Sequence, residues 1–147
     1  MRSLLVLRKS RRVPASIDRS RSLEELEGDR WPAPPADATY LMTTVHALRS
    51  RPVGTLTVED LRLLIGQDVG LPVLLVLAVE VLRDNPPAEG DMYEGDLLRA
   101  VLTRSPAVWN AYLDLARRLT LIVGGLSGLS PDLLSTVERF VGSLQSS

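Results

Sequence analysis

The stretch that decides the fold is Leu71-Pro72-Val73-Leu74-Leu75-Val76-Leu77-Ala78-Val79-Glu80-Val81-Leu82, residues 71–82. It is the longest apolar stretch of the sequence, yet it contains Glu80 and falls far below the roughly 20 residues that span a bilayer. Its valines would suit a buried strand. Its length, and a proline that fits the first turn of a helix, favour instead a central helix that runs to about Arg83 and is surrounded by its neighbours.

Signals for helix starts and stops recur on both sides of this stretch, whereas strand alternation and hairpin turns are missing. Helices are predicted to begin after a capping box at Ser22 and after caps at Asp37, Thr57, Asp96, Ser105 and Ser130. The helix after Asp37 runs to about Arg49 and the helix after Thr57 runs to Ile65. The last two span residues 106–122 and 131–144. Gly66 is expected to end its helix in a left-handed conformation. We therefore predict an all-α fold, a single-domain bundle of about six to seven helices.

Three further expectations concern the segment before the central helix. Trp31-Pro32-Ala33-Pro34-Pro35 excludes both a helix interior and a central strand, so we predict an extended segment that Trp31 holds to the body. Leu41, Val45 and Leu48 have core spacing in the following helix. His46 lies beside them and is predicted to be a partly buried structural residue.

The basic residues are concentrated at the N-terminus. Residues 1–21 hold seven basic residues and one acid, and we predict that they form a disordered tail. Residues 22–147 form the predicted helical domain, whose net charge is −7. A folded body of this charge repels phosphate, so we expect it to bind no nucleic acid and to prefer a basic protein surface. With no export signal and no membrane span, the protein is expected in the cytoplasm.

Catalytic and metal-binding patterns are missing from the sequence. The chain has no cysteine and only one histidine, which leaves neither a metal-ligand set nor a histidine-based relay, and we expect no metal and no cofactor. The run from Gly124 to Gly128 lacks the spacing of a nucleophile elbow or a phosphate loop and is predicted to be a helix end and a turn. An enzyme that uses the paired carboxylates Asp91 and Glu94 is a minor alternative.

One acidic segment departs from the usual rules. Between Glu80 and Asp96 there are six acids and one base. Tyr93 and Met92, residue types enriched in interface cores, lie in its middle. An acidic loop with a central aromatic residue suits docking onto a basic surface. A merely solvated acidic loop is the other interpretation; the ligand spacing of an EF-hand is absent. The predicted partner-binding residues are Asp84, Glu89, Asp91, Tyr93 and Glu94.

Several motifs resemble a family of contact-dependent growth inhibition (CDI) immunity proteins over roughly residues 22–102. They are Ser22-Leu23-Glu24-Glu25-Leu26-Glu27-Gly28, His46-Ala47-Leu48-Arg49, Leu56-Thr57-Val58-Glu59-Asp60-Leu61-Arg62-Leu63-Leu64-Ile65-Gly66-Gln67, Val69-Gly70-Leu71-Pro72 and Ala88-Glu89-Gly90-Asp91-Met92-Tyr93-Glu94-Gly95-Asp96-Leu97-Leu98. The basic tail and the residues beyond about 103 do not match the family pattern.

The resemblance implies a cytoplasmic protein that is not an enzyme and that binds and neutralises a cognate toxin domain by covering its active site. Toxins opposed by such proteins are often nucleases, and a basic nuclease cleft would suit the acidic segment. The alternative from another class is a regulatory or adaptor protein that uses the basic tail, residues 1–21, on nucleic acid or membrane. The sequence leaves the toxin and the oligomeric state open.

Overall fold

The computed structural model describes residues 16–145 of the protein. They form α2 (Leu23–Glu27), α3 (Tyr40–Arg49), a 3-10 turn η1 (Val53–Thr55), α4 (Val58–Gly66), α5 (Leu71–Asp84), α6 (Asp96–Leu102), α7 (Pro106–Ala111), α8 (Leu113–Gly124) and α9 (Pro131–Gln145). The described part contains no strand, and the predicted all-α class is confirmed. Eight α-helices, rather than six or seven, appear there.

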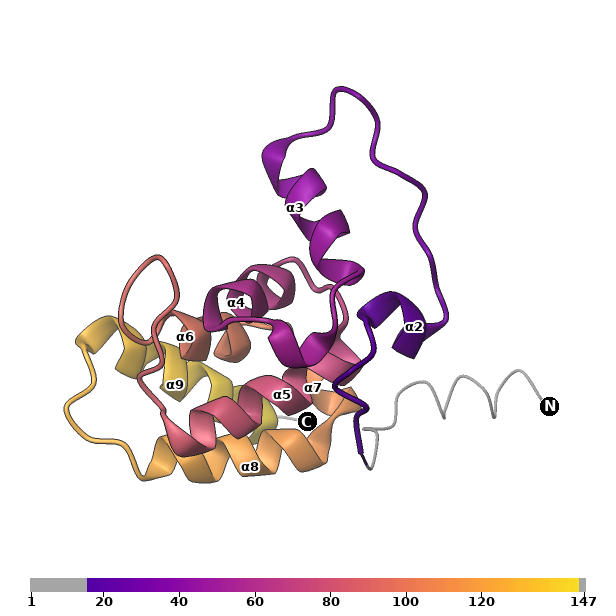
Figure 1. Ribbon diagram of the computed structural model, residues 1–147. Helices are drawn as coiled ribbons and strands as arrows, with labels where there is room; N and C mark the ends of the chain where they lie inside the picture. The colour runs from indigo at the N-terminus through magenta and orange to yellow at the C-terminus, as the bar shows by residue number, and fades with distance from the viewer. Residues whose placement is uncertain (1–15, 146–147) are drawn as a thin grey trace.

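Helix α5 is the centre of the core, as its sequence predicts. It lies among α4, α6 and α8 and contacts all three (Figure 1). Its apolar side chains are buried on almost every side. The chain enters it through Gly70, whose φ of 66° is left-handed. A Cβ at Gly70 would lie 2.8 Å from Leu23 Cδ1, so both the backbone and the packing require glycine there. No helix of the described residues is long and apolar enough to cross a membrane.

The predicted caps are mostly correct. Ser22 and Thr57 both form capping boxes, with Glu25 and Asp60 as the reciprocal carboxylates. The hydroxyls of Ser105 and Ser130 accept from Val108 N and Leu133 N at 3.4 Å and 3.2 Å.

Two predicted helix ends were wrong. Thr39, not Asp37, caps α3, because its hydroxyl accepts from Met42 N at 3.1 Å. Gly66 is still helical, and the left-handed residue after α4 is Asp68, with a φ of 57°. Gly66 therefore did not mark the left-handed residue that follows α4, because an aspartate also tolerates the left-handed conformation.

The predicted helix over 106–122 is interrupted at Tyr112, where φ is −129° and ψ is 55°. The interruption lets its two halves face different neighbours. In α7, buried Trp109 meets Phe140 of α9 edge-on, with ring centroids 5.4 Å apart. Helix α8 packs instead along α5. The break therefore depends on packing against two different helices, α9 and α5. No residue near Tyr112 in the sequence predicts it.

The basic N-terminal segment meets the body before Ser22. The carbonyls of Arg19 and Arg21 accept from Gly54 N and Val53 N, each at 2.9 Å. Arg19 also forms an ion pair with Glu80 of α5. Contacts with the folded body thus begin earlier than the sequence indicated. The predicted disorder of residues 1–15 lies outside the described residues.

Residues 29–50, which we call the arm, project from the other helices as an extended segment and α3 (Figure 1). Arg49 joins its two halves: the side chain is 1% exposed, Nη2 donates to Glu27 Oε1 at 3.0 Å and Asp29 O at 2.8 Å, and the guanidinium lies 4.0 Å from the Trp31 ring centroid. Trp31 therefore holds the extended segment to the end of α3, within the arm, whereas the sequence predicted a contact with the body. Val45 and Leu48 are buried, but Leu41 is 37% exposed and is not a core residue.

Candidate functional site

The acidic segment forms a compact loop between α5 and α6, which we call the acidic loop (residues 85–95). Glu89 and Glu94 face each other in an isolated antiparallel bridge. At the base of the loop, Gly95 N donates to Pro87 O at 3.2 Å. The loop thus turns back on itself and brings its two ends together.

A buried carboxylate fixes the backbone of this loop. Asp96 is 3% exposed and accepts hydrogen bonds from Gly90 N at 2.7 Å, Met92 N at 3.0 Å and Tyr93 N at 3.3 Å. The sequence predicted Asp96 as the N-cap of α6, which is wrong: Gly95, with a φ of 87°, holds that position, and Asp96 is the first helical residue. Its side chain turns back to the loop and satisfies amides there.

A second carboxylate, Glu59 of α4, holds the tip of the loop. Its Oε1 accepts from Asp91 N at 2.9 Å, and Arg62 donates to both of its oxygens, at 2.6 Å and 2.5 Å. Arg62 Nε also lies 3.8 Å from Asp96 Oδ2. A Cβ on Gly90 would lie 2.6 Å from Glu59 Oε1, so only glycine fits against this carboxylate. We call Glu59, Arg62 and Asp96 the clamp.

The hydrogen bonds of the clamp shift the pKa values of Glu59 and Arg62. Arg62, and then the Asp91 amide, lower the pKa of Glu59 below its ordinary value of 4.5, and Glu59 in turn raises the pKa of Arg62. A carboxyl with a lowered folded-state pKa stabilises the fold above its unfolded pKa, and this stabilisation is lost as the pH falls through the folded value.

We therefore expect Glu59→Gln to destabilise the protein most at neutral pH. The difference in free energy of unfolding from the unchanged protein should shrink below about pH 4.5 and vanish at lower pH, because the native carboxyl is then protonated too. Urea titrations of both proteins at several pH values measure this difference. A difference that stays constant from neutral to acidic pH would contradict the role of the charged Glu59.

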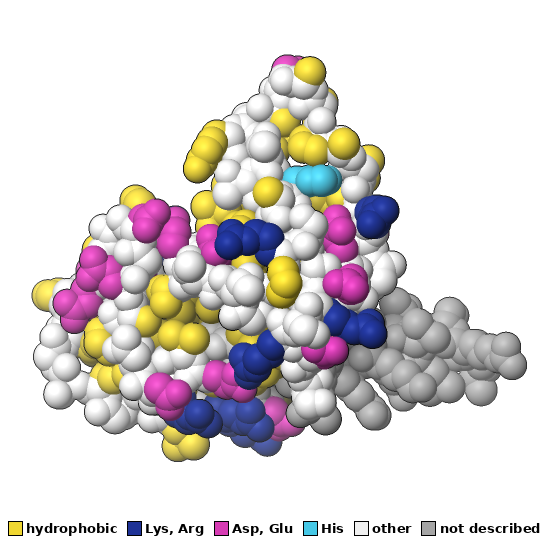
Figure 2. Space-filling view, viewed as in Figure 1, with side chains coloured by type: hydrophobic (Ala, Val, Ile, Leu, Met, Phe, Trp, Pro, Cys, Tyr) yellow, Lys and Arg dark blue, Asp and Glu magenta, His cyan; other side chains and the backbone are white. Residues whose placement is uncertain are grey.

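The structure gathers four of the five predicted binding residues. Glu89, Asp91, Tyr93 and Glu94 are all exposed on the acidic loop, and acidic side chains gather over this part of the molecule in Figure 2. Asp84 is separate: it pairs with Arg83 at 3.2 Å and lines another hollow, with Arg19 and Glu80.

The three loop carboxylates are exposed and uncompensated. Within residues 16–145 none of Glu89, Asp91 and Glu94 forms an ion pair, although Arg62 is close enough to Asp91 for its pKa to respond to that charge. Exposed Met92 and Tyr93 lie between them in the chain. Because the clamp bonds only to backbone amides of the loop, the side chains of Glu89, Asp91 and Glu94 are left free to face a partner.

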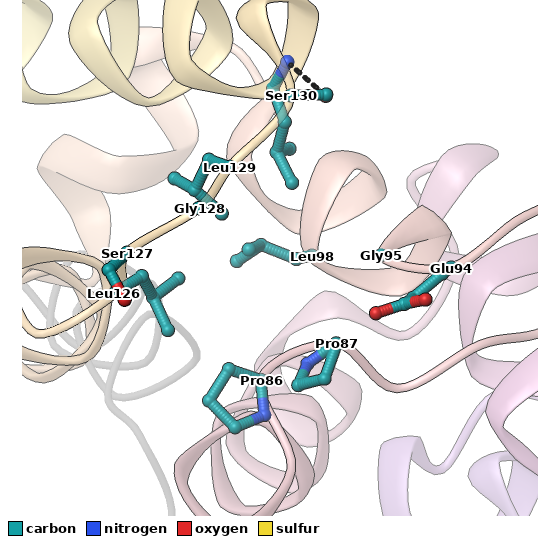
Figure 3. A pocket seen from close by; sticks show the side chains of 11 residues that line it. Pro86, Pro87, Glu94, Gly95, Leu98, Leu126, Ser127, Gly128, Leu129 and Ser130 are labelled. Carbon is teal, nitrogen blue, oxygen red and sulfur yellow. Dashed lines mark hydrogen bonds between the residues drawn. The ribbon is translucent and has the colours of Figure 1, made fainter.

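Two hollows adjoin Glu94. The larger, of about 440 Å³, lies between the acidic loop and the connection from α8 to α9, and Glu94 points into it (Figure 3). The smaller, of about 250 Å³, is lined by Tyr93, Glu94, Arg99 and Asp132 among others. There Arg99 Nη1 donates to Asp132 Oδ2 at 2.8 Å, a bond that raises the pKa of Arg99.

Nothing in the described part of the chain resembles a catalytic or metal centre. No three histidine, cysteine, aspartate or glutamate side chains among residues 16–145 come together to hold a metal ion. His46 lies on the arm, half-buried, beside Trp31 and Met42, far in sequence from the acidic loop. Gly124 ends α8 and Gly125 caps it, as the sequence predicted.

Sequence reasoning missed the clamp, although its signal was present. Glu59 and Arg62 lie in one of the motifs that carry the family resemblance, and Gly90 and Asp96 lie in another. The structure shows that the two motifs bond to each other. Two motifs that lie about 30 residues apart in the sequence therefore form one structural unit, the acidic loop and its clamp.

The described residues form an all-α body with an ordered and exposed acidic loop, a surface suited to binding another protein. Residues 25–119 match the family of CDI immunity proteins, and the chain belongs to this family. Members neutralise a cognate CDI toxin by binding it and are not enzymes, which confirms the predicted family and the predicted absence of enzymatic activity. The chain has no match among curated proteins.

Proposed function

We propose that the acidic loop binds the basic active-site cleft of the cognate toxin, in the cytoplasm, and blocks it. The observation that carries this proposal is a set of three exposed carboxylates, Glu89, Asp91 and Glu94, on a backbone already ordered by buried groups. Because the loop is ordered before binding, little conformational entropy is lost when it docks. The complementary charge would also speed the encounter.

A nuclease domain is the toxin class that best fits this surface. A nuclease must attract a phosphate backbone and therefore presents a positively charged cleft. The body beyond residue 21 has a net charge of −7, so a positively charged cleft attracts it, as the cleft attracts nucleic acid itself. Exposed Tyr93 adds an aromatic contact of the kind that interface centres favour.

Reversing the charge of the loop tests the proposal. The double variant Asp91→Lys, Glu94→Lys is expected to slow association with the cognate toxin domain by about tenfold or more and to weaken binding by a few kcal/mol. The slowing should diminish at high salt, because screening removes the long-range attraction. Surface-based kinetics with a catalytically inactive toxin domain, at low and high ionic strength, measure both effects.

The control variant is Asp37→Lys, Glu138→Lys, which changes the net charge equally at two exposed acids on the arm and on α9. It should leave the dissociation rate unchanged. Equal effects of the two double variants would mean that only overall charge matters, and unchanged binding by the loop variant would place the toxin elsewhere. A chain that lacks residues 1–15 should bind the toxin as well as the full chain does.

A further inference from the structure

We propose that the hollow beside Glu94 is a slot that takes one lysine or arginine side chain of the toxin. This inference rests on the proposed function and names the chemistry of one contact within it. The slot is formed by residues on both sides of a gap between two loops, namely Pro86, Pro87, Gly95 and Leu98 on one side and Leu126, Ser127, Gly128, Leu129, Ser130 and Leu133 on the other, with Glu94 at the edge.

The walls of the slot suit a long, amphipathic cation. Apart from Ser127 and Ser130, its side-chain lining is apolar, and Glu94 is its single ionisable group. A lysine or arginine side chain has an aliphatic stem that gains from apolar contact and a charged head that needs an acceptor. A purely apolar side chain would leave Glu94 partly desolvated without a partner, which is costly.

The two ends of the slot differ in their electrostatics, which fixes the direction of the cation. Figure 3 shows Ser130 at the top of the slot and Glu94 at its right, while the Leu98 side chain reaches away from Glu94 into the middle. Ser130 lies just before α9 and accepts a hydrogen bond from Leu133 N, and the N-terminus of a helix carries a positive partial charge. A cationic head is therefore repelled from that end and attracted to the carboxylate at the other. The stem would then lie along Pro87 and Leu98.

Glu94 is available because the arginine that lines the smaller hollow with it is already paired. Arg99 shares the smaller hollow with Glu94, but it donates to Asp132 at 2.8 Å, and no ion pair joins it to Glu94 within the described residues. Asp132 thus acts as a positioning residue: it pairs with Arg99 and leaves the Glu94 charge for the toxin.

Double-mutant cycles test the slot. Glu94→Gln removes the charge, and Leu129→Trp fills the slot with a larger side chain. Each is combined with alanine replacements of the lysines and arginines of an inactive toxin domain, and dissociation constants are measured for the full chain. We expect one basic toxin residue to be coupled to both positions: its replacement should weaken binding to the unchanged protein about tenfold or more but have little effect on either variant.

The control is Leu121→Trp, which adds the same bulk at an exposed leucine on α8 outside the slot and should change no coupling. If Leu129→Trp unfolds the protein, Ser127→Trp fills the slot from an exposed position. The slot is overturned if no toxin residue is coupled to both positions, or if Leu129→Trp weakens binding while Glu94→Gln does not. An unaffected affinity in the charge-reversal variant would instead overturn the proposed function itself.

Discussion

Replacing Asp96 by alanine is expected to have the largest effect on both folding and toxin binding. The substitution leaves the amides of Gly90, Met92 and Tyr93 without their acceptor and leaves Arg62 without one of its two nearby carboxylates. Hydrogen bonds to a charged group contribute about 1.5–3 kcal/mol each, and they are not additive. We expect a loss of about 3–5 kcal/mol in the free energy of unfolding.

The loss should be local as well as global. Hydrogen exchange of the three loop amides is expected to become fast, and toxin affinity should fall because binding must then order the loop. Asp96→Asn is the matched variant: its amide oxygen keeps an acceptor but loses the charge, so its effect should be smaller. Unchanged exchange of these amides in Asp96→Ala would show that Asp96 does not order the loop.

Arg49→Ala is expected to give the second largest effect, on the arm rather than the loop. Arg49 is fully buried, pairs with Glu27 and contacts the Trp31 ring. Truncating a long buried side chain to alanine costs about 2–5 kcal/mol in lost packing, here including packing against the ring, and it also leaves the partly exposed Glu27 without its partner. We expect a destabilisation of that size in urea unfolding, and a red shift of Trp31 emission because its ring becomes more exposed.

Arg49→Met separates charge from packing in the same experiment. Two nitrogens of Arg49, Nε and Nη1, have no hydrogen-bond partner among the described residues, so the guanidinium is incompletely satisfied. An apolar side chain of similar length should therefore recover part of the stability, and Glu27→Gln added to it should recover more. If Arg49→Met were as harmful as Arg49→Ala, packing against Trp31 would not contribute.

The sequence alone predicted those features that depend on neighbouring residues. The central helix α5 follows from a long apolar run with a proline at its start, and the capping boxes at Ser22 and Thr57 follow from residues three positions apart. The acidic loop was located from its charge and its glycines. In each case the deciding interaction lies within a few residues along the chain.

The features that sequence reasoning missed depend on long-range contacts. The interruption at Tyr112 allows α7 to pack against α9 and α8 to pack against α5. Asp96 was assigned to its own helix because its partners lie in a loop whose shape the sequence does not show. Asp84 was grouped with the loop because it is close in sequence, although the helix end turns it toward Arg19 and Glu80.

If the acidic loop binds the toxin as proposed, the clamp separates recognition from folding. The bonds that shape the acidic loop run from its backbone amides to Glu59 and Asp96, and the outward carboxylates of Glu89, Asp91 and Glu94 take no part in them. Substitutions at these three positions should therefore alter which toxin is bound at little cost in stability. A lineage that holds the clamp constant can diversify its loop side chains and follow a changing toxin, with the same scaffold serving many cognate pairs.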